Sequence, residues 1–359
     1  MIESRALSLS RWRFLWIEFM NLVMFVFTRM VQNRVSELKL IFLTLVIIYV
    51  TIPIAFKMCP IIVTKMIYLN FLHKPFSDFN QPTNYLLNHT LNLYLTPEEG
   101  ITVGVWFTIP DKRWQEASGK DQQWYEAALG DDNPIIIYLH GNGGSRAVGH
   151  RVELIKMLSA HGFHVLALDY RGWADSTGEP SEVGITTDSL YLFEWTRARS
   201  GKSHVCLWGH SLGTGVATNT ARILYEKGSP ADAIILEAPF TSMREEVAHH
   251  PLAVYYKLYP GFEWFFLDAI TENNIFFHNV ENLQSISTPV LILHAEDDDI
   301  VPFELGKKLY ESLLDSPMLR RQVIFVAFPE FLGYKHNNIY KDPELPDIIK
   351  DFVKAMHRY

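Results

Sequence analysis

The chain has 359 residues, 48% of them hydrophobic, which is enough for one large domain with additional segments. Its net charge of −8 is uneven, because residues 1–79 hold nine Lys/Arg against four Asp/Glu while the remainder is acidic. A basic head on an acidic body indicates contact with a membrane. The body has no basic stripe with interleaved aromatic side chains, which argues against nucleic acid as a partner. The two cysteines, Cys59 and Cys206, are not expected to form a disulfide.

The basic head contains one uncharged stretch, residues 40–56 (LIFLTLVIIYVTIPIAF), between Lys39 and Lys57. Crossing a bilayer takes about 20 apolar residues, and apolar residues resume after Lys57. We therefore predict a transmembrane helix over residues 40–56, with a buried core helix as the alternative. A cleaved signal peptide is disfavoured, because the stretch starts late and no A-x-A-like site follows it.

Residues 1–39 form an N-terminal basic segment, in which Phe14–Thr28 is apolar but contains Glu18 and Asn21. We interpret this stretch as an interfacial helix, with a second membrane span as the alternative. Six Lys/Arg lie before Leu40 and three in the twenty residues after Phe56, but the near flanks alone are equal, so the charges favour a cytosolic N-terminus only weakly. The sequon NHT makes Asn88 a candidate glycosylation site, which requires the body to lie in a lumen or outside the cell.

The body alternates short apolar runs with helical patterns. A hairpin is expected over residues 90–95 and 101–109, after a linker at 57–89. Nearly continuous apolar runs, typical of strands covered on both faces, follow at 134–141, 164–172, 204–211, 232–240, 289–297 and 322–328. Helical patterns lie at 146–160, 184–199, 212–227, 304–314 and the C-terminal end of the chain. This alternation predicts an α/β fold over residues 90–359, with a mainly parallel central sheet and helices on both faces.

The run at 204–211 leads into the pattern G-x-S-x-G, Gly209 to Gly213. In that motif the serine sits on a sharp turn between a strand and a helix, and glycines are needed because a Cβ would clash where the chain doubles back. A dinucleotide fingerprint is excluded, because Thr218 stands where its third glycine would be. An ordinary turn with a surface serine is the alternative. We identify Ser211 as the candidate nucleophile.

A serine nucleophile needs a histidine base and an acid that orients it, in the chain order Ser, Asp/Glu, His. Four carboxylates, Glu296 to Asp299, follow the apolar run that starts at residue 289, and the residues alone leave Asp297, Asp298 and Asp299 open. His336 lies in a loop after the last run, and His357 in the terminal helical pattern is the only other candidate for the base.

The sequence HGNGG, His140 to Gly144, follows the run at 134–141 and suits an oxyanion hole. Its donors should be the backbone N–H groups of Asn142 and of Leu212, the residue after the nucleophile. Nearby Arg146 and Arg151 could meet a phosphate, although solvation at the surface is the expected state. No H-E-x-x-H or Cys/His spacing suggests a metal, and no cofactor is expected.

These motifs together, with YLHGNGG, LDYRGWADSTGEPSE, WGHSLGTGVATN and LILHAEDDDIVP, resemble those of the membrane-anchored α/β-hydrolase-domain lipases. The likeness extends to GKDQQWYEAAL, PGFEWFFLDAIT and GYKHNNIYKDPELP, and is closest to members that cleave lysophosphatidylserine and monoacylglycerols. It runs from about residue 68 to the C-terminus.

The resemblance implies an α/β-hydrolase fold with Ser211 as nucleophile, His336 as base and Asp298 as orienting acid, since D-x-x-V-P is the family pattern. Here Asp299 stands where a proline is common. The resemblance also implies a single-pass protein of the endoplasmic reticulum membrane with a lumenal catalytic domain, which agrees with the Asn88 sequon.

Residues 238–288 interrupt the strand pattern and suit a cap rich in aromatic residues. Such a cap could form an acyl-chain pocket or touch lipid, or its aromatic residues could only anchor it. Three hypotheses follow: an esterase of lysophospholipids and monoacylglycerols, an S-acyl protein thioesterase with the same triad, and a tethered binding protein with a vestigial triad. The complete set of triad and oxyanion residues argues against the third, and only the resemblance separates the first two.

Overall fold

A computed structural model describes residues 16–28, 37–72, 77–317, 319 and 322–355 of the chain. The chain divides into two compact units, Met1–Met58 and Cys59–Tyr359. The second unit carries the sheet and every candidate site residue. It begins at Cys59, so part of the segment 57–89, expected to be a linker, belongs to it.

The first unit is helical where it is described. A helix covers Trp16–Thr28, and α2 runs from Glu37 to Met58. Within the described residues, Lys39–Met58 of α2 is the one stretch long and apolar enough to cross a membrane, and it contains the predicted span. The hydroxyls of Thr44 and Thr51 donate to the carbonyls one turn earlier, at 2.8 Å each. This arrangement leaves neither hydroxyl unsatisfied in an apolar environment.

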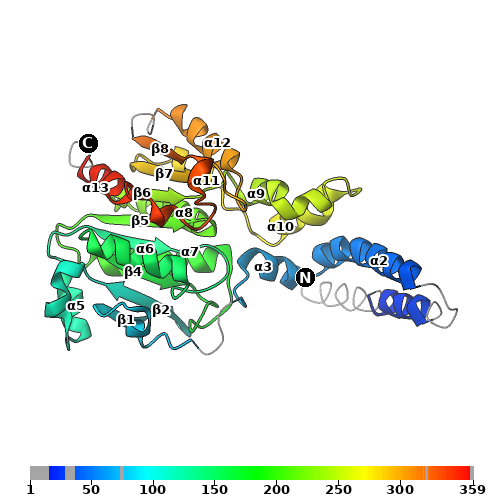
Figure 1. The fold of residues 1–359 in the computed structure, drawn as a ribbon, viewed down its shortest axis with the longest axis horizontal. Coiled ribbons are helices and arrows are strands. Elements are labelled where there is room, and N and C mark those ends of the chain that lie inside the picture. The colour runs from blue at the N-terminus through cyan, green and yellow to red at the C-terminus, as the bar shows by residue number, and fades with distance from the viewer. Residues whose placement is uncertain (1–15, 29–36, 73–76, 318, 320–321, 356–359) are drawn as a thin grey trace. The chain divides into compact units, whose positions relative to one another are not determined.

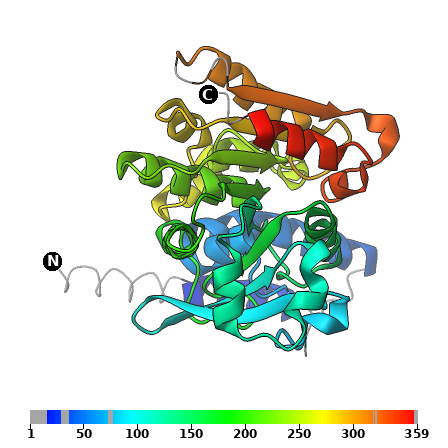
Figure 2. The same ribbon diagram turned by 90° about the vertical axis from the view of Figure 1, so that its left-hand side faces the viewer.

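The second unit is built on an eight-stranded sheet in the order β1-β2-β4-β3-β5-β6-β7-β8. The hairpin strands β1 (Thr90–Glu98) and β2 (Ile101–Thr108) are antiparallel to each other, and β2 is antiparallel to β4. The other strands pair in parallel. They are β3 (Ile135–Leu139), β4 (His164–Asp169), β5 (Val205–His210), β6 (Ala233–Glu237), β7 (Val290–Ala295) and β8 (Val323–Phe328). Figure 2 shows the hairpin at one edge of the sheet and β8 at the other.

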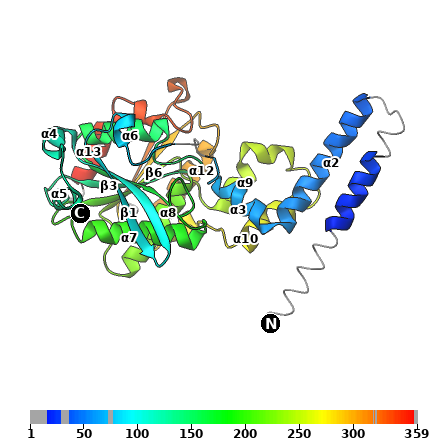
Figure 3. The same ribbon diagram turned by 90° about the horizontal axis from the view of Figure 1, so that it is seen from below.

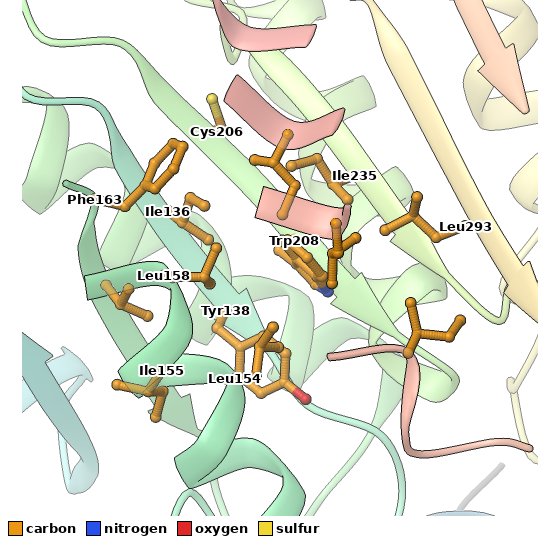
Figure 4. Packing of buried hydrophobic residues seen from close by; sticks show 14 of the residues in the cluster. Ile136, Tyr138, Leu154, Ile155, Leu158, Phe163, Cys206, Trp208, Ile235 and Leu293 are labelled. Atoms are coloured by element: carbon orange, nitrogen blue, oxygen red, sulfur yellow. The ribbon is translucent and has the colours of Figure 1, made fainter. Parts of the chain in front are cut away.

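Helices cover both faces of the sheet, as Figure 1 shows. They are α6 (Gly149–Ala160), α7 (Glu182–Arg197), α8 (Leu212–Glu226), α12 (Phe303–Leu314) and α13 (Leu345–Ala355). On the face covered by α6 and α13, Leu154 and Leu158 of α6 pack with Ile136 of β3 and Trp208 of β5 in one buried cluster (Figure 4). The continuous apolar runs of the central strands follow from this two-sided burial.

The connection between β6 and β7 forms a cap. It contains α9 (Met243–His249), the 3-10 turn η3 (Pro251–Tyr255), the π-helical turn η4 (Glu263–Leu267), α10 (Asp268–Glu272) and α11 (Asn279–Gln284). Its aromatic residues divide: Phe240 and Phe277 are buried, whereas Tyr255 and Trp264 are exposed. Some of these rings therefore anchor the cap and others face outward. Two short helices, α4 (Trp114–Ala117) and α5 (Gln122–Ala128), follow the hairpin.

The predicted architecture is confirmed, with a mainly parallel sheet, helices on both faces and a cap between β6 and β7. An element without a predicted counterpart is α3 (Pro60–Tyr68), which lies in the second unit directly after α2. Its C-cap, Leu69, has a φ of 47°, and the chain turns there toward the loop that follows β3.

Candidate active site

Ser211 lies at the turn between β5 and α8, near the middle of the sheet. Its φ of 54° and ψ of −120° fall in a region that costs a non-glycine residue roughly 1–3 kcal/mol. The turn is held by hydrogen bonds from the Ser211 N–H to the Glu237 carbonyl, at 2.9 Å, and from the Thr214 N–H to the Ser211 carbonyl, at 2.8 Å. This is the strained strand-to-helix turn that the G-x-S-x-G motif predicts.

The glycines of the motif are required by close backbone approaches. A Cβ on Gly209 would collide with the carbonyl of Gly213 across the turn, and one on Gly213 would collide with the carbonyl of Leu139 at the end of β3. Neither obstacle can move away without disturbing α8 or the sheet. The motif therefore owes its spacing to packing at the elbow.

His336 and Asp298 form a hydrogen-bonded pair. They follow β8 and β7, so they lie, like Ser211, at the carboxyl ends of the parallel strands. The Nδ1 atom of His336 lies 2.8 Å and 3.0 Å from the two carboxylate oxygens of Asp298. Because both neighbours are acceptors, Nδ1 carries the proton, and Nε2 is left with a lone pair that can accept one. This is the tautomer that a general base requires.

The Asp298 carboxylate is held by several donors. Its Oδ1 accepts the N–H groups of Ile300 and Val301, each at 2.9 Å, and the Nε2 of His294 lies 3.3 Å from Oδ2. Burial raises the pKa of Asp298, but the hydrogen bonds from His294 and His336 outweigh it, so the pKa falls well below its usual range. Asp298 is thus ionised at neutral pH and can stabilise a charged imidazole.

The neighbouring aspartates make different contacts. Asp297 accepts the backbone N–H of Lys335 at 2.9 Å, and Asp299 lies 3.2 Å from the Lys335 ammonium. Among the contacts the structure gives these three carboxylates, the imidazole of His336 bonds to Asp298. Asp297 and Asp299 support the loop in front of the histidine instead.

The loop after β3 approaches the serine closely. A Cβ on Gly141 would lie 3.1 Å from the Cβ of Ser211, so the loop backbone sits beside the hydroxyl-bearing carbon. Within the described part of the chain, the N–H groups of Asn142 and Leu212 donate to no protein acceptor. Both are therefore free to receive an oxyanion.

Arg146 and Arg151 are buried rather than solvated, which corrects the expectation for both. The Arg151 guanidinium donates to the carbonyls of Gly143 and Ser145, at 2.9 Å each, and to that of Gly141 at 3.3 Å. Arg146 binds Asp169 and Asp175 and stacks over the ring of Phe79. Neither guanidinium is placed to meet a phosphate, because both side chains are buried and their terminal nitrogens already donate to loop carbonyls, carboxylates or, for Arg146, also the Asn92 side chain.

Two histidines that the sequence did not single out support the pair. His210, inside the G-H-S of the motif, has its Nε2 3.0 Å from the carbonyl of His336 and its ring 4.8 Å from the His336 ring. Burial, with the charge of His336, keeps the pKa of His210 well below its usual range, so it is neutral and donates to that carbonyl. Its place beside Ser211 in the motif is the sequence signal that could have identified His210. His294, on β7 just before the acids, has a fully buried side chain.

A second carboxylate–imidazole contact lies between Asp169, the last residue of β4, and His140. The two side chains are fully buried, with His140 Nε2 3.2 Å from a carboxylate oxygen of Asp169. His140 Nδ1 lies 2.7 Å from the Gly141 carbonyl, so the proton of a neutral ring is used there. Asp169 is compensated by Arg146, whose backbone N–H donates to it at 2.7 Å and whose guanidinium donates at 2.5 Å.

Two further expectations concern the surface and metals. Asn88 is exposed in the turn before β1, so its side chain is accessible to modification. Within the described ranges, no group of three or more His, Cys, Asp or Glu side chains is arranged to hold a metal ion.

Comparison with known protein families shows that residues 134–267 match the family described as "alpha/beta hydrolase fold". The chain is 52% identical over 323 residues to the lysophosphatidylserine lipase ABHD12 of Danio rerio, covering 89% of this chain and 85% of that protein. It is 54% identical over 319 residues to that of Rattus norvegicus, covering 88% and 80%. It is 50% identical over 293 residues to the protein ABHD12B of Homo sapiens, covering 81% and 80%.

Solved structures share the fold at low sequence identity. The Pyrococcus furiosus esterase Pf2001 superposes with a TM-score of 0.55 at 18% identity, covering 76% of this chain and 92% of that one. An alpha-beta hydrolase from Vibrio vulnificus gives a TM-score of 0.58 at 19% identity, covering 82% and 92%. The overall architecture is therefore that of known α/β-hydrolases.

Proposed function

Because the chain belongs to the ABHD12 lysophosphatidylserine lipase family of α/β-hydrolases, we propose that it is a membrane-anchored serine hydrolase that cleaves the acyl ester of lysophosphatidylserine, and also those of other lysophospholipids and of monoacylglycerols. Ser211 is the nucleophile, His336 the general base and Asp298 the orienting acid. The backbone N–H groups of Asn142 and Leu212 form the oxyanion hole.

Acylation begins when His336 Nε2 takes the proton of the Ser211 hydroxyl as Oγ attacks the ester carbonyl carbon. The carbonyl π electrons move to oxygen, and the resulting oxyanion accepts the N–H groups of Asn142 and Leu212. Asp298 stabilises the imidazolium without taking its proton. His336 then gives its proton to the departing glycerol oxygen, which leaves as the alcohol and the acyl chain stays on Ser211.

Deacylation repeats these steps with water. His336 Nε2 removes a proton from a water molecule, whose oxygen attacks the acyl carbon and forms a second oxyanion in the same hole. Collapse of this intermediate breaks the bond to Ser211 Oγ, which regains a proton from His336. The products are a free fatty acid and the restored serine.

The observation that carries the proposal is the hydrogen-bonded pair of His336 and Asp298 at the sheet edge where Ser211 sits on its strained turn. The pair supplies the base in the required tautomer, and the free N–H groups supply the electrostatic stabilisation that acyl transfer needs. The choice of lysophosphatidylserine rests on the names of the relatives.

The experiment compares the full chain with Ser211→Ala in the same membranes. A fluorophosphonate probe should label the wild type at Ser211, and the variant should lose labelling together with release of fatty acid from lysophosphatidylserine, by about 10⁶-fold in kcat as for a serine triad. Labelling that persists in the variant contradicts the nucleophile. Labelling at Ser211 with hydrolysis of S-acyl peptides alone contradicts the substrate class.

We further propose that α2 anchors the protein by a single span in the endoplasmic reticulum membrane, with residues 59–359 in the lumen and the N-terminus in the cytosol. The length and apolar composition of α2 and the exposure of Asn88 support this topology. Asn88 should then carry a glycan. A glycosidase should increase the mobility of the wild type and leave Asn88→Gln unchanged, and protease should remove an N-terminal tag from sealed microsomes. Absence of a mobility shift, with the tag and the body degraded together, contradicts this topology.

A further inference from the structure

The segment that follows α2 is bound to the loop that carries the Asn142 donor. The N–H of Gly143 donates to the Tyr68 carbonyl at 3.1 Å, and the N–H of Gly144 donates to the Leu72 carbonyl at 2.5 Å. The last carbonyls of a helix have no partner within it. In α3 and the residues after it, such carbonyls accept from the loop.

The same loop is held from its other side by Arg151, which donates to the carbonyls of Gly141, Gly143 and Ser145. The carbonyls of the segment accept hydrogen bonds from N–H groups of the loop, and the Arg151 guanidinium donates to carbonyls of the loop. The loop is therefore bound through both its N–H and its C=O groups. Gly143 and Gly144 have φ values of 61° and 71°. Glycine has little intrinsic preference for this conformation over others, so these bonds select it.

The segment is itself fixed to the sheet unit by specific contacts. The buried ring of Tyr68 meets Trp173 edge-on, with centroids 5.7 Å apart. Asn70 is 6% exposed, and its Nδ2 donates to the Gly172 carbonyl at 2.8 Å while its Oδ1 accepts from Lys65 at 3.2 Å. Lys65 also pairs with Glu179 at 3.0 Å.

We propose that residues 60–72 are a positioning element of the oxyanion hole, with Asn70 and Lys65 as the positioning residues. The inference rests on the proposed function. Neither residue touches substrate. They hold the Tyr68 and Leu72 carbonyls where these fix the loop, so that the Asn142 N–H points at the developing charge. Misplacing such a donor by about 1 Å can cost about 10²-fold in rate.

The experiment uses the full chain with Asn70→Ala and, separately, Lys65→Ala, whose side chain is partly exposed. Both should lower kcat per titrated active site, Asn70→Ala by roughly tenfold or more, while KM changes little. The affinity for a trifluoromethyl ketone, which forms an oxyanion on the enzyme, should fall in parallel. Asn133→Ala is the matched control, because it also loses one side-chain hydrogen bond, from Lys112, but lies just before β3, at the end of the strands opposite to the site.

The rate of fluorophosphonate labelling separates this inference from the proposed function. If Ser211 is labelled but lysophosphatidylserine is not a substrate, the labelling rate still reports the oxyanion hole and should fall in the Asn70 and Lys65 variants. If the two variants match Asn133→Ala in labelling rate, kcat and ketone affinity, the positioning role is overturned. If Asn70→Ala does not fold, the same three measurements on Lys65→Ala test the positioning role.

A second observation is independent of these hydrogen bonds. Large apolar side chains are exposed on α3 and on the cap: Ile61 is 63% exposed, Met66 49%, Leu252 60%, Val254 62% and Leu258 96%. Helix α3 packs against α10, α10 contacts η4, and α9 contacts both η4 and η3. The exposed residues therefore belong to adjoining elements (Figure 3). Exposed groups of this kind are uncommon on a protein that meets only water.

We infer that the outer sides of α3 and the cap form a surface that rests on the lipid bilayer. The candidate span ends at Met58 and α3 begins at Pro60. Two residues of extended chain reach only about 7 Å, so a membrane-inserted α2 keeps the start of α3 within about that distance of the end of the span. Around Leu258 the charges along the chain are few and of opposite sign, with Lys257 directly before it and Glu263 as the first residue of η4.

The test attaches a nitrobenzoxadiazole dye to Leu258→Cys in a Cys59→Ser background of the full chain, reconstituted in phosphatidylcholine vesicles. Lipids with a nitroxide on the acyl chain should quench most of its fluorescence. The matched control is Ile324→Cys. Ile324 is 46% exposed and lies near the start of β8, at the amino ends of the parallel strands. A dye at this position should keep its fluorescence. Equal quenching at both sites, or none at Leu258→Cys, overturns the inference and leaves a protein partner as the occupant of the surface.

Discussion

The carboxyl edge of the sheet holds two buried aspartate–histidine contacts, Asp298 with His336 and Asp169 with His140. In the first, the histidine Nδ1 proton is directed at the carboxylate, so the opposite nitrogen carries a lone pair. In the second, the Nδ1 proton goes to the Gly141 carbonyl, so a neutral His140 has none for Asp169.

The charges of the two aspartates are compensated differently. Asp169 faces the permanent positive charge of Arg146, whereas Asp298 is bonded to two histidines and two backbone N–H groups. In the mechanism proposed above, the first contact gains its positive partner when His336 becomes protonated during acyl transfer. Proximity of an aspartate and a histidine therefore does not identify a triad. The direction of the histidine proton and the other partners of the carboxylate do.

Among changes to these carboxyl groups, the largest effect should come from removing the charge of Asp298. Asp298→Asn turns an acceptor toward Nδ1 into a group that can also donate, which favours the wrong tautomer of His336 and should lower kcat by about 10⁴-fold. The measurement is fatty acid release per folded molecule, with thermal unfolding as the control for folding. An Asp298→Asn enzyme with nearly normal kcat would show that the two contacts do not differ in role.

The corresponding change in the second contact should act on stability. Asp169→Asn leaves the buried Arg146 with Asp175 as its carboxylate partner, and breaking a buried ion pair from one side costs about 3–5 kcal/mol. Thermal unfolding should show this loss, while kcat per titrated active site stays within about tenfold, since the change does not reach the reacting atoms. A normal unfolding temperature combined with a large loss of kcat would assign Asp169 to catalysis.

A third carboxyl at this edge, Glu237, sharpens the comparison because it has a neutral partner. Trp208 Nε1 donates to it at 3.0 Å, and burial raises its pKa to about 7. The unfolded chain loses this proton near the ordinary value of 4.5, whereas the folded chain keeps it up to about pH 7. Stability should therefore fall as pH rises through this window, by about 3 kcal/mol in total.

Glu237→Gln should remove this pH dependence, so that the variant gains stability relative to the wild type between pH 5 and pH 8. The measurement is the thermal unfolding temperature of the full chain at both pH values. The exposed Glu99→Gln is the control and should follow the wild type at both. The same difference between wild type and Glu237→Gln at both pH values would contradict the raised pKa.

Much of the fold and the elbow could be predicted from sequence. The strands show as continuous apolar runs because both faces of the sheet are covered, and the Ser211 turn shows because backbone approaches require glycine at Gly209 and Gly213. The motif order also located the histidine loop. Each of these features can be read from a short stretch of sequence, even where, as for Gly213 against Leu139, the group that requires it lies far away in the chain.

Features that depend on distant partners could not be predicted. Arg146 and Arg151 were expected at the surface because charged residues usually are, and their partners became visible only once loops and strands were placed together. The role that we propose for residues 60–72 could not be predicted, because their carbonyls accept hydrogen bonds from a loop some 75 residues away in sequence. Among Asp297, Asp298 and Asp299, composition gives no choice, because the folding of the loop onto the N–H groups of Ile300 and Val301 decides which side chain turns inward.

The smallest effect should follow from changing Asp297, which distinguishes supporting the histidine loop from orienting the histidine. Asp297 bonds to the backbone N–H of Lys335, a residue with a φ of 50°. Asp297→Asn keeps an oxygen that can accept this bond and removes only its charge assistance, which is worth about 1 kcal/mol. We expect kcat to fall by less than about tenfold, with Lys112→Ala, remote from the site, as the control for handling of the membranes. A loss approaching that of Asp298→Asn would mean that the imidazole uses Asp297 during turnover, and the distinction between the two aspartates drawn from their contacts would fail.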